Sequence, residues 1–360
     1  MRIAFHFPRL ASGGVEKMRI VLATELLSRG IQVDFVLCQA SGEYLDQVPA
    51  GVRVIDLKAS RTLNSVFPLV RYLNRERPDR LVSSLGPQNI VAIVASRLSR
   101  AKTPVYVTQH NALSRQASNE TMAQRVVPIL YRWLLPRADG VIAVSRGIAI
   151  DMAARCAVPL ERIQVVYNPA YSGVSAETGE PSLPEGVTRY VLAIGRLVEQ
   201  KAYPDLLAAF ATVAREDAGL DLLVLGNGPL LADLEELARE LGIERRVHFL
   251  GFVKNPAAYL AGCSVFVLSS RYEGFGNVIV EALSVGAKVV STRCDFGPDE
   301  ILADGKYGVL VPVGDQSALA VAMRDALDSD VDRASLIARA KEFSPGTVTA
   351  NYLRVLGCGQ

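Results

Sequence analysis

The sequence is poor in cysteine, histidine and long apolar runs, and each shortage excludes a class of protein. Its five cysteines are scattered, odd in number and without CxxC spacing, which argues against a disulfide framework or a thiolate metal site. Three well-separated histidines leave no HExxH-type zinc site. No apolar run approaches the ~18–20 residues of a membrane span, and the first ten residues do not read as a signal peptide. We therefore expect a cytoplasmic protein.

Several common catalytic motifs are missing as well. There is no GxxxxGK[ST] P-loop, no GxGxxG after the first predicted strand and no GxSxG nucleophile elbow. The turn at 226–229 has two of the dinucleotide glycines, but Leu231 stands in the third place. The DxD pairs at 328–332 lie between two predicted helices and are typical of helix caps. These absences disfavour hydride transfer, P-loop hydrolysis and zinc chemistry.

The net charge of +2 conceals two halves of opposite charge. Residues 1–170 hold 22 Lys and Arg against 12 Asp and Glu, a balance of +10, and residues 171–360 hold 17 against 25, a balance of −8. The basic half suits an anionic surface or substrate, although uneven surface charge without a function would give the same count. Neither an RNP-type aromatic pair nor a zinc finger accompanies it, so we expect no nucleic acid partner.

Strand and helix patterns alternate along the whole chain. Short apolar runs without polar alternation indicate strands that are buried on both faces of a parallel sheet. These runs lie at 3–7, 33–37, 52–57, 80–85, 105–110, 141–145, 163–167, 190–194, 220–225, 247–250, 265–269, 288–291 and 308–311. A Ser/Gly/Glu/Pro-rich stretch at 171–188 is typical of a linker. We predict two doubly wound α/β domains, 1–170 and 189–343, with a cleft between them and a C-terminal helix in 344–360.

The most informative segment follows one buried strand and reads RYEGFGNVIVEA. Ligands of such sheets bind beyond the carboxyl ends of the strands. Gly274 and Gly276 let the backbone approach a ligand, and Asn277 is a candidate N-cap whose neighbouring N–H groups would face a diphosphate. Glu273 and Glu281 would add acceptors for hydroxyl groups. A ligand with both phosphates and hydroxyls is a nucleotide-sugar, although a plain turn with solvated charges has the same residues.

A second cluster follows the first strand after the linker. Arg196 leaves the strand end, and Lys201 lies five residues later, near a predicted helix start. Two cations at a strand's carboxyl end can neutralise a diphosphate leaving group without a metal ion, although such a pair also suits an ordinary surface. The turn that holds Asn227 and Gly228 would let a nucleoside approach the backbone, or it is a structural turn.

Taken together, these motifs resemble the family-four retaining glycosyltransferases, which have the GT-B fold of two facing Rossmann-like domains. The resemblance spans nearly the whole chain, and its Glu-x7-Glu element is the most specific part. It implies that the N-terminal domain binds the acceptor, that the C-terminal domain binds the nucleotide-sugar donor, and that the C-terminal helix in 344–360 crosses back to the N-terminal domain. The matching elements, in the family's order and spacing, are Gly13-Gly14-x-Glu16, Thr108-x-His110, Ala143-Val144-Ser145, Tyr167-Asn168-Pro169, Gly195-Arg196…Lys201, Gly226-x-Gly228-Pro229, Phe249-Leu250-Gly251-Phe252 and Glu273-Gly274-Phe275-Gly276…Glu281. Two residues depart from the pattern: Ala202 stands where the family usually has glycine, and Gly276 where many members have proline.

The resemblance implies a role for each matched residue. Glu281 would hold the ribose hydroxyls of the donor, and Glu273 would face hydroxyls of the transferred sugar. Arg196 and Lys201 would bind the diphosphate, and His110 would lie beside the transferred sugar. The remaining donor-binding residues would contribute backbone groups or line the base pocket; they are Gly14, Gly195, Asn227, Gly228, Phe252, Val253, Gly274, Phe275, Gly276 and Asn277.

The implied activity is transfer of a hexosyl or N-acetylhexosaminyl group from a nucleoside-diphosphate sugar, with UDP as the expected nucleotide and no metal or other cofactor. Retention of the anomeric configuration follows from same-face attack, while a nucleophilic role for Glu273 stays open. The expected acceptor is a glycan or lipid-linked acceptor of bacterial-type cell-surface polysaccharide, lipopolysaccharide or glycolipid synthesis. The alternatives are a sucrose- or trehalose-type enzyme with a small soluble acceptor, and a non-catalytic subunit that binds a sugar nucleotide.

The segment 124–137, QRVVPILYRWLLPR, bears on where the protein works. A basic amphipathic stretch of this kind can lie on an anionic membrane, but a core helix kinked at Pro128 has the same pattern. The basic N-terminal half favours a protein that is peripheral to the inner face of the cytoplasmic membrane.

Overall fold

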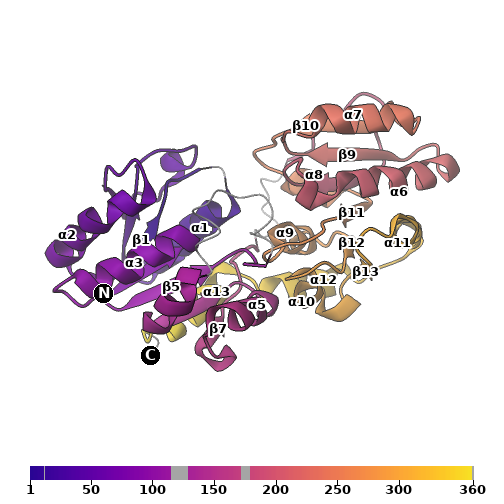
Figure 1. The fold of residues 1–360 in the computed structure, drawn as a ribbon. Helices are drawn as coiled ribbons and strands as arrows, with labels where there is room; N and C mark the ends of the chain where they lie inside the picture. Colours follow the sequence, from indigo (N-terminus) through magenta and orange to yellow (C-terminus); the bar gives the residue numbers. More distant parts are fainter. Residues whose placement is uncertain (12, 115–128, 172–178, 359–360) are drawn as a thin grey trace. The chain divides into compact units, whose positions relative to one another are not determined.

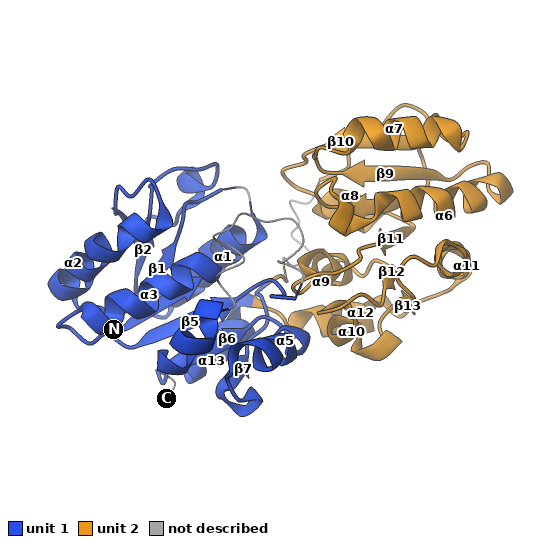
Figure 2. Ribbon diagram, viewed as in Figure 1, with its two compact units in different colours: residues 1–169, 345–360 blue, residues 170–344 orange. Residues whose placement is uncertain are grey.

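The computed structural model describes residues 1–11, 13–114, 129–171 and 179–358. The chain forms two compact units: unit 1 is Met1–Pro169 with Pro345–Gln360, and unit 2 is Ala170–Ser344. Figure 2 draws unit 1 in blue and unit 2 in orange. Each unit contains one parallel sheet with helices and its own hydrophobic core, which confirms the predicted class of two Rossmann-like α/β domains.

Unit 1 is built on a seven-stranded sheet in the order β3-β2-β1-β4-β5-β6-β7. Its strands are β1 (Arg2–Phe7), β2 (Gln32–Leu37), β3 (Val52–Asp56), β4 (Arg80–Ser84), β5 (Val105–Gln109), β6 (Gly140–Ala143) and β7 (Ile163–Val165). β1 pairs with β2 over its whole length, from Arg2 opposite Gln32 to Phe7 opposite Leu37. The central strands β1 and β5 are buried on both faces, in keeping with their mostly apolar sequences.

The helices of unit 1 include one from the far end of the chain. They are α1 (Gly14–Ser28), α2 (Val66–Glu76), α3 (Gly86–Leu98), α5 (Arg146–Cys156) and α13 (Pro345–Val355), with short 3-10 turns η1 (Leu45–Gln47), η2 (Thr62–Ser65), η3 (Leu135–Arg137) and η4 (Leu160–Arg162). α13, yellow in Figure 1, packs against α1. Tyr352 and Leu356 join Phe5, Phe35 and Leu22 in one hydrophobic cluster. The C-terminal helix therefore completes the core of unit 1.

Unit 2 is built on a six-stranded parallel sheet in the order β10-β9-β8-β11-β12-β13. Its strands are β8 (Tyr190–Ile194), β9 (Asp221–Leu225), β10 (Val247–Gly251), β11 (Val265–Leu268), β12 (Val289–Thr292) and β13 (Val309–Val311). Residues 179–188, which precede β8, form no helix or strand. All thirteen runs that the sequence predicts as strands are strands in the two sheets.

The helices of unit 2 surround this sheet. They are α6 (Tyr203–Glu216), α7 (Leu231–Glu240), α8 (Ala257–Gly262), α9 (Asn277–Ser284), α10 (Pro298–Ile301), α11 (Gln316–Asp328) and α12 (Arg333–Lys341), with η5 (Glu199–Lys201) and η6 (Ala303–Gly305). Leu206 of α6, Leu234 of α7 and Met323 of α11 pack together on the buried side chains of the strands. Across the described ranges, no helix combines the length and the apolar character needed to cross a membrane.

Candidate functional site

The strand order of a doubly wound sheet reverses at one point, and ligands bind there, beyond the carboxyl ends of the strands. In unit 2 the chain runs outward from β8 through β9 to β10 and then returns to β11 on the other side of β8. The switch point therefore lies between β8 and β11. The segments that follow these two strands carry predicted residues, among them the charged residues Arg196, Lys201 and Glu273.

Lys201 and Glu273 form a direct ion pair at this switch point. Lys201 Nζ lies 2.5 Å from Glu273 Oε1, which also accepts a hydrogen bond of 2.6 Å from Ser270 Oγ. The two charged side chains are mostly buried, with exposed fractions of 16% and 9%. Because an ammonium has three N–H donors, Lys201 can bind Glu273 and still donate to a second anion. Two residues that the sequence predicts separately thus belong to one cluster.

Hydrogen bonds hold the segment after β8 against the segment after β11. Ser269 Oγ donates to the carbonyl of Lys201 at 2.7 Å, and the N–H of Arg271 donates to the carbonyl of Gln200 at 2.8 Å. The side-chain amide of Gln200 donates to the carbonyl of Tyr272, also at 2.8 Å. Lys201 is therefore positioned by its backbone as well as by its ion pair.

Two glycines bring the loops after β8 and β9 into backbone contact. A Cβ on Gly226 would lie 2.0 Å from the carbonyl oxygen of Gly195, and one on Gly228 would lie 2.3 Å from that of Leu197. The N–H of Leu197 donates to the carbonyl of Asn227 at 3.0 Å. The predicted residues Gly195, Asn227 and Gly228 thus form one tight corner, in which only glycine fits at 226 and 228.

Helix α9 begins directly after the loop that contains Glu273. The sequence predicts Asn277 as its N-cap, and this is wrong: the N-cap is Gly276, and Asn277 is the first helical residue. The reason is the backbone of Gly276, whose φ of 96° and ψ of 49° suit glycine better than any residue with a Cβ. Glu281 lies one turn into the helix and is half-buried.

The loop before α9 packs closely against Phe343 and against the loop after β12. The ring of Phe275 is buried edge-on against Phe343, with 5.5 Å between the ring centroids, so a ligand could reach only the backbone of this predicted residue. A Cβ on Gly297 would lie 1.9 Å from the carbonyl oxygen of Phe275, which brings the loop after β12 into contact with it. Gly274, between Glu273 and Phe275, is half-buried.

Three further predicted residues of unit 2 are at least partly exposed. Arg196 is exposed at the end of β8, and among the described residues no carboxylate lies within ion-pair distance of it. Phe252, directly after β10, exposes 64% of its surface, and Val253 beside it is half-buried. An unpaired guanidinium can bind a phosphate, and an exposed aromatic ring can stack on a base.

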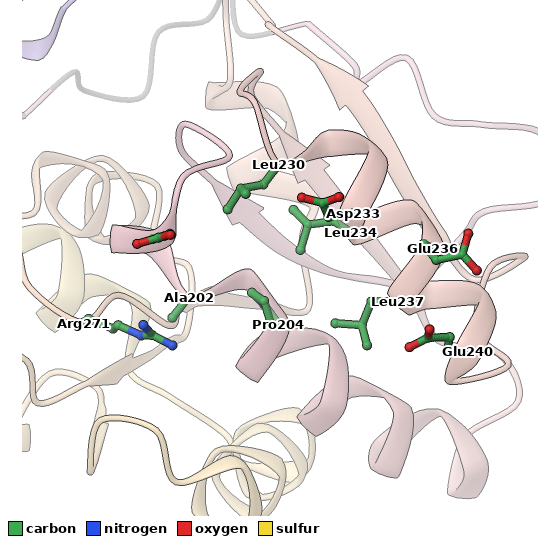
Figure 3. Close-up of a pocket in the computed structure, with 10 residues that line it drawn as sticks. Ala202, Pro204, Leu230, Asp233, Leu234, Glu236, Leu237, Glu240 and Arg271 are labelled. Carbon is green, nitrogen blue, oxygen red and sulfur yellow. The ribbon is translucent and has the colours of Figure 1, made fainter. Parts of the chain in front are cut away.

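A pocket of about 500 Å³ lies between α6 and α7 (Figure 3). Its apolar lining includes Leu230, Leu234 and Leu237. Its charged lining consists of Arg271 and four carboxylates, those of Glu199, Asp233, Glu236 and Glu240. Because four carboxylates around one cation repel a diphosphate, this pocket does not suit a nucleotide-sugar. The predicted site residues do not line it.

In unit 1 the switch point lies between β1 and β4. Gly14 is the first residue of α1, which follows β1, and Gly13 is its N-cap. His110 directly follows β5, the strand next to β4. These two predicted residues therefore follow strands at or next to the switch point of unit 1.

His110 is buried beside a cation. It is 7% exposed, and its Nε2 lies 3.3 Å from Nη2 of Arg19. Burial, together with the charge of Arg19, holds the pKa of His110 well below its ordinary value of 6.5, so the ring is neutral at pH 7. Its Nδ1 has no hydrogen-bond partner among the described residues.

Three residues around His110 are not among the predicted ones, namely Arg19, Ser84 and Tyr352. Arg19 could have been noticed in the sequence. Helical spacing places it beside Met18 and Leu22 on the buried face of α1, where a charged residue is unusual. Ser84 and Tyr352 reach Arg19 only through the tertiary fold. Among the residues that the structure describes, no three His, Cys, Asp or Glu side chains are grouped as metal ligands.

Two family models together match most of the chain. Residues 12–170 match the model described as Glycosyltransferase Family 4, and residues 177–343 match the model described as Glycosyl transferases group 1. The chain belongs to the family-four glycosyltransferases. The resemblance inferred from the sequence motifs is thereby confirmed, and so is the GT-B fold expected with it.

Curated relatives of this glycosyltransferase match it over nearly their whole length. The Campylobacter jejuni N-acetylgalactosamine-N,N'-diacetylbacillosaminyl-diphospho-undecaprenol 4-alpha-N-acetylgalactosaminyltransferase is 26% identical over 96% of this chain and 97% of its own. The lipopolysaccharide core biosynthesis glycosyltransferase LpsE of Rhizobium meliloti is 28% identical over 98% of this chain and 97% of its own. Among solved structures, Anabaena HepE in complex with UDP-glucose has a TM-score of 0.80 at 22% identity and 99% coverage of both chains, a likeness of fold.

Proposed function

We propose that this glycosyltransferase moves a sugar from a UDP-sugar to a glycan or lipid-linked acceptor of cell-surface polysaccharide, lipopolysaccharide or glycolipid synthesis, with retention of the anomeric configuration. The observation that carries the proposal is the ion-paired cluster of Lys201 and Glu273 at the switch point of unit 2. UDP is the first nucleotide to test because the fold relative HepE was solved with UDP-glucose. The acceptor class follows the Campylobacter relative, whose name contains diphospho-undecaprenol.

In this proposal the protein stabilises the departing nucleoside diphosphate. As the bond between sugar and phosphate lengthens, negative charge develops on the β-phosphate. Lys201 has N–H donors beyond the one used by Glu273, Arg196 is exposed and unpaired among the described residues, and α9 starts nearby with its N–H groups. Fixed donors of this kind supply the stabilisation that a metal ion would otherwise give.

Glu273 acts in this proposal as a hydrogen-bond acceptor for sugar hydroxyls. Its Oε1 already accepts hydrogen bonds from Lys201 and Ser270, which makes the carboxylate a weaker nucleophile than a free one. We therefore prefer same-face attack by the acceptor over a covalent intermediate on Glu273. Glu281 would hold the ribose hydroxyls, and Phe252 with Val253 would contact the base.

We further propose that the protein contacts the inner face of the cytoplasmic membrane. Residues 124–128 of the predicted amphipathic segment lie outside the described residues, but residues 129–134 are helical. Trp133 exposes 66% of its surface there, whereas Tyr131 is buried in the fold. Part of this segment is therefore core, and part of it presents apolar surface to solvent.

A second surface of unit 1 has the same character. Leu63 and Phe67, at η2 and the start of α2, are 72% and 78% exposed. Residues 57–75 contain four cations and no carboxylate. Exposed apolar side chains beside a surplus of cations favour binding to an anionic bilayer. A soluble acceptor, by contrast, predicts activity that does not depend on membranes or lipid.

The donor is tested by thermal shift with UDP, GDP, ADP and CMP, with and without EDTA, followed by turnover with the matching sugar nucleotides. A ligand well above its Kd raises the melting temperature, so we expect a shift with UDP that EDTA does not change. A shift with a different nucleotide would replace UDP in the proposal, and a shift abolished by EDTA would contradict metal independence. A non-catalytic subunit predicts a shift without turnover on any acceptor.

The role of Glu281 is tested with Glu281→Ala. Because it removes a charged acceptor for two hydroxyls, we expect the Kd for the nucleoside diphosphate to rise about tenfold to a hundredfold. Glu235→Ala, which removes an exposed carboxylate of α7, is the matched control and should leave the Kd unchanged. Equal affinity of Glu281→Ala and the wild type, measured by calorimetry, would refute the assignment.

A further inference from the structure

Unit 1 contains a buried cation without a carboxylate partner. Arg19 is 4% exposed, and among the described residues no carboxylate lies within ion-pair distance of its guanidinium. Its charge acts on Glu16 in the first turn of α1, but burial outweighs this effect and raises the pKa of Glu16. A buried charge that is not paired needs hydrogen bonds in a defined geometry, because removal from water is otherwise very costly.

Neutral groups from three other elements surround this guanidinium. Nε and Nη2 donate to Ser84 Oγ at 3.0 and 2.7 Å, and Nη1 donates to the hydroxyl of Tyr352 on α13 at 2.9 Å. The guanidinium also lies over the rings of Phe5 and Tyr352, at 5.3 and 5.6 Å from their centroids. Its orientation is therefore fixed independently of His110.

The remaining contact of Arg19 determines where His110 carries its proton. Nη2 of Arg19 lies 3.3 Å from Nε2 of His110. Since a guanidinium only donates hydrogen bonds, Nε2 has to accept this one and cannot carry a proton. A neutral imidazole with a bare Nε2 has its proton on Nδ1. That Nδ1 is buried and has no partner in the described part of the chain, so its N–H is left for a ligand or a water that enters the site.

The other groups that face His110 do not compete with this effect. Thr108, two residues earlier on β5, and Tyr352 on α13 are uncharged and bonded to each other at 3.2 Å. Ser84 on β4 is occupied by Arg19. Thr108 and Tyr352, together with Arg19 and Asn168, line a cavity of about 10 Å³ beside His110, no larger than one water. Arg19 is the charged group that acts on the ring.

We propose that Arg19 is a positioning residue that holds His110 as the neutral tautomer with its proton on Nδ1, and that Tyr352 of the C-terminal helix holds Arg19 in place. The available Nδ1–H is then a hydrogen-bond donor of fixed direction. If His110 lies beside the transferred sugar, as the proposed function has it, this donor suits a sugar hydroxyl. The tautomer itself does not depend on that function.

The tautomer is measured directly by NMR of the imidazole nitrogens in the full-length protein labelled with 15N. The chain has only three histidines, and His110→Asn identifies the signals of His110 by their loss. We expect Nδ1 to be protonated and Nε2 unprotonated at pH 7, with the ring neutral because its pKa is lowered. A protonated Nε2 in the wild-type protein would overturn the proposal.

Two variants test the cause. Arg19→Met removes the donor and the charge, so the tautomers should mix and the ring should titrate at a higher pH than in the wild type, while Arg19→Lys should restore part of the wild-type state. Tyr352→Phe removes only a hydroxyl and should give a weaker effect in the same direction if Arg19→Met does not fold. Tyr106→Phe is the matched control, because its buried hydroxyl donates to the carbonyl of Leu356 and does not contact Arg19. An unchanged tautomer in both Arg19→Met and Tyr352→Phe would refute positioning by Arg19.

Activity separates this inference from the proposed function. Asn places an amide N–H near the position of Nδ1, whereas Gln places it near Nε2, so His110→Asn should keep more activity than His110→Gln, by about tenfold in kcat/KM. Tyr352→Phe should lower kcat/KM in proportion to its loss of the wild-type tautomer. If the tautomer shifts but turnover does not, His110 has no part in transfer and the positioning by Arg19 still stands.

Discussion

The two units use a buried cation in opposite ways. In unit 2, Lys201 is paired with the carboxylate of Glu273, so the two charges compensate each other. In unit 1, the partners of Arg19 are the hydroxyls of Ser84 and Tyr352 and a ring nitrogen, all uncharged. Both clusters lie at or next to the switch points of their sheets.

The difference shows what each cation can do. A paired ammonium can share its remaining N–H donors with an arriving anion, because the carboxylate uses only one of the three. A cation with neutral partners keeps its full electrostatic effect on nearby groups, because the protein interior screens charges only weakly. Here the charge of Arg19 adds to burial in disfavouring protonation of His110. Unit 2 is thus suited to hold a charged ligand, and unit 1 to hold a neutral donor.

The largest effect is expected when the unit 2 pair is broken. Lys201→Ala leaves the mostly buried Glu273 without its cation, which should lower the free energy of unfolding by roughly 3 kcal/mol. In the proposed function it also removes a donor to the leaving group, so kcat should fall by roughly 10²- to 10³-fold. Thermal or urea unfolding and initial rates measure the two losses separately.

Arg196→Ala is the comparison variant. This exposed side chain has no ion pair among the described residues, so stability should stay within about 0.5 kcal/mol of the wild type while kcat falls. The double variant Lys201→Ala/Glu273→Gln should recover stability but not activity. If Lys201→Ala is as stable as the wild type, Glu273 does not need the charge of Lys201 for its burial. The proposed difference between the buried cations of the two units would then be wrong.

As the pH is lowered, the stability of unit 1 should fall before that of unit 2. His6 is fully buried on β1, Nδ1 bonds the carbonyl of Val36 at 2.9 Å, and burial lowers its pKa from 6.5 to about 4. Below pH 6.5 the unfolded chain therefore takes up a proton that the folded chain does not, and stability falls progressively down to about pH 4. For His6 alone the loss is about 3 kcal/mol, and His110 adds to it in the same direction.

Hydrogen exchange followed separately in the two units from pH 7 to pH 4 measures this effect. Protection of unit 1 should decrease over that range more than protection of unit 2, whose one histidine, His248, is half-buried. His6→Asn keeps a donor near Val36 but does not titrate, so it should flatten the dependence. If the protection of unit 1 depends on pH in the same way in His6→Asn and in the wild type, His6 is not the cause of its acid sensitivity.

The smallest effect concerns two alanines in left-handed backbone, one in each unit. Ala202, the N-cap of α6, has φ 47° and is buried, and Ala157, after α5, has φ 51° and is exposed. Ala157→Gly should stabilise the protein by about 0.5 kcal/mol, because it relieves strain without loss of packing. Ala202→Gly should be close to neutral, because it also removes a buried methyl group. A larger gain at Ala202 in thermal unfolding would show that strain outweighs packing there.

The parallel strands could be predicted because apolar runs of four to six residues need no partner to be recognised. The loops after β8 and β11 could be identified as a site for the same reason, since the site of a doubly wound sheet follows from its strands. The ion pair of Lys201 with Glu273 could not, because it joins residues 72 positions apart. Nor could the network of Arg19 and Tyr352, which are separated by 333 positions. The N-cap of α9 lies one residue before the predicted one, because Asn and Gly are both common at N-caps and the sequence does not show the positive φ that selects Gly276.

The return of α13 to unit 1 has a consequence for the order in which the protein is made. Along the sequence, unit 2 comes between the two segments of unit 1. A ribosome therefore finishes all of unit 2 before it adds the helix that carries Tyr352. Until then Arg19 lacks its hydroxyl partner, and the core around Phe5 lacks Tyr352 and Leu356. A nascent chain that stops before Pro345 therefore has every loop of unit 2 in place while the surroundings of His110 are unfinished. The surroundings of His110 therefore depend on a helix that is made after all of unit 2.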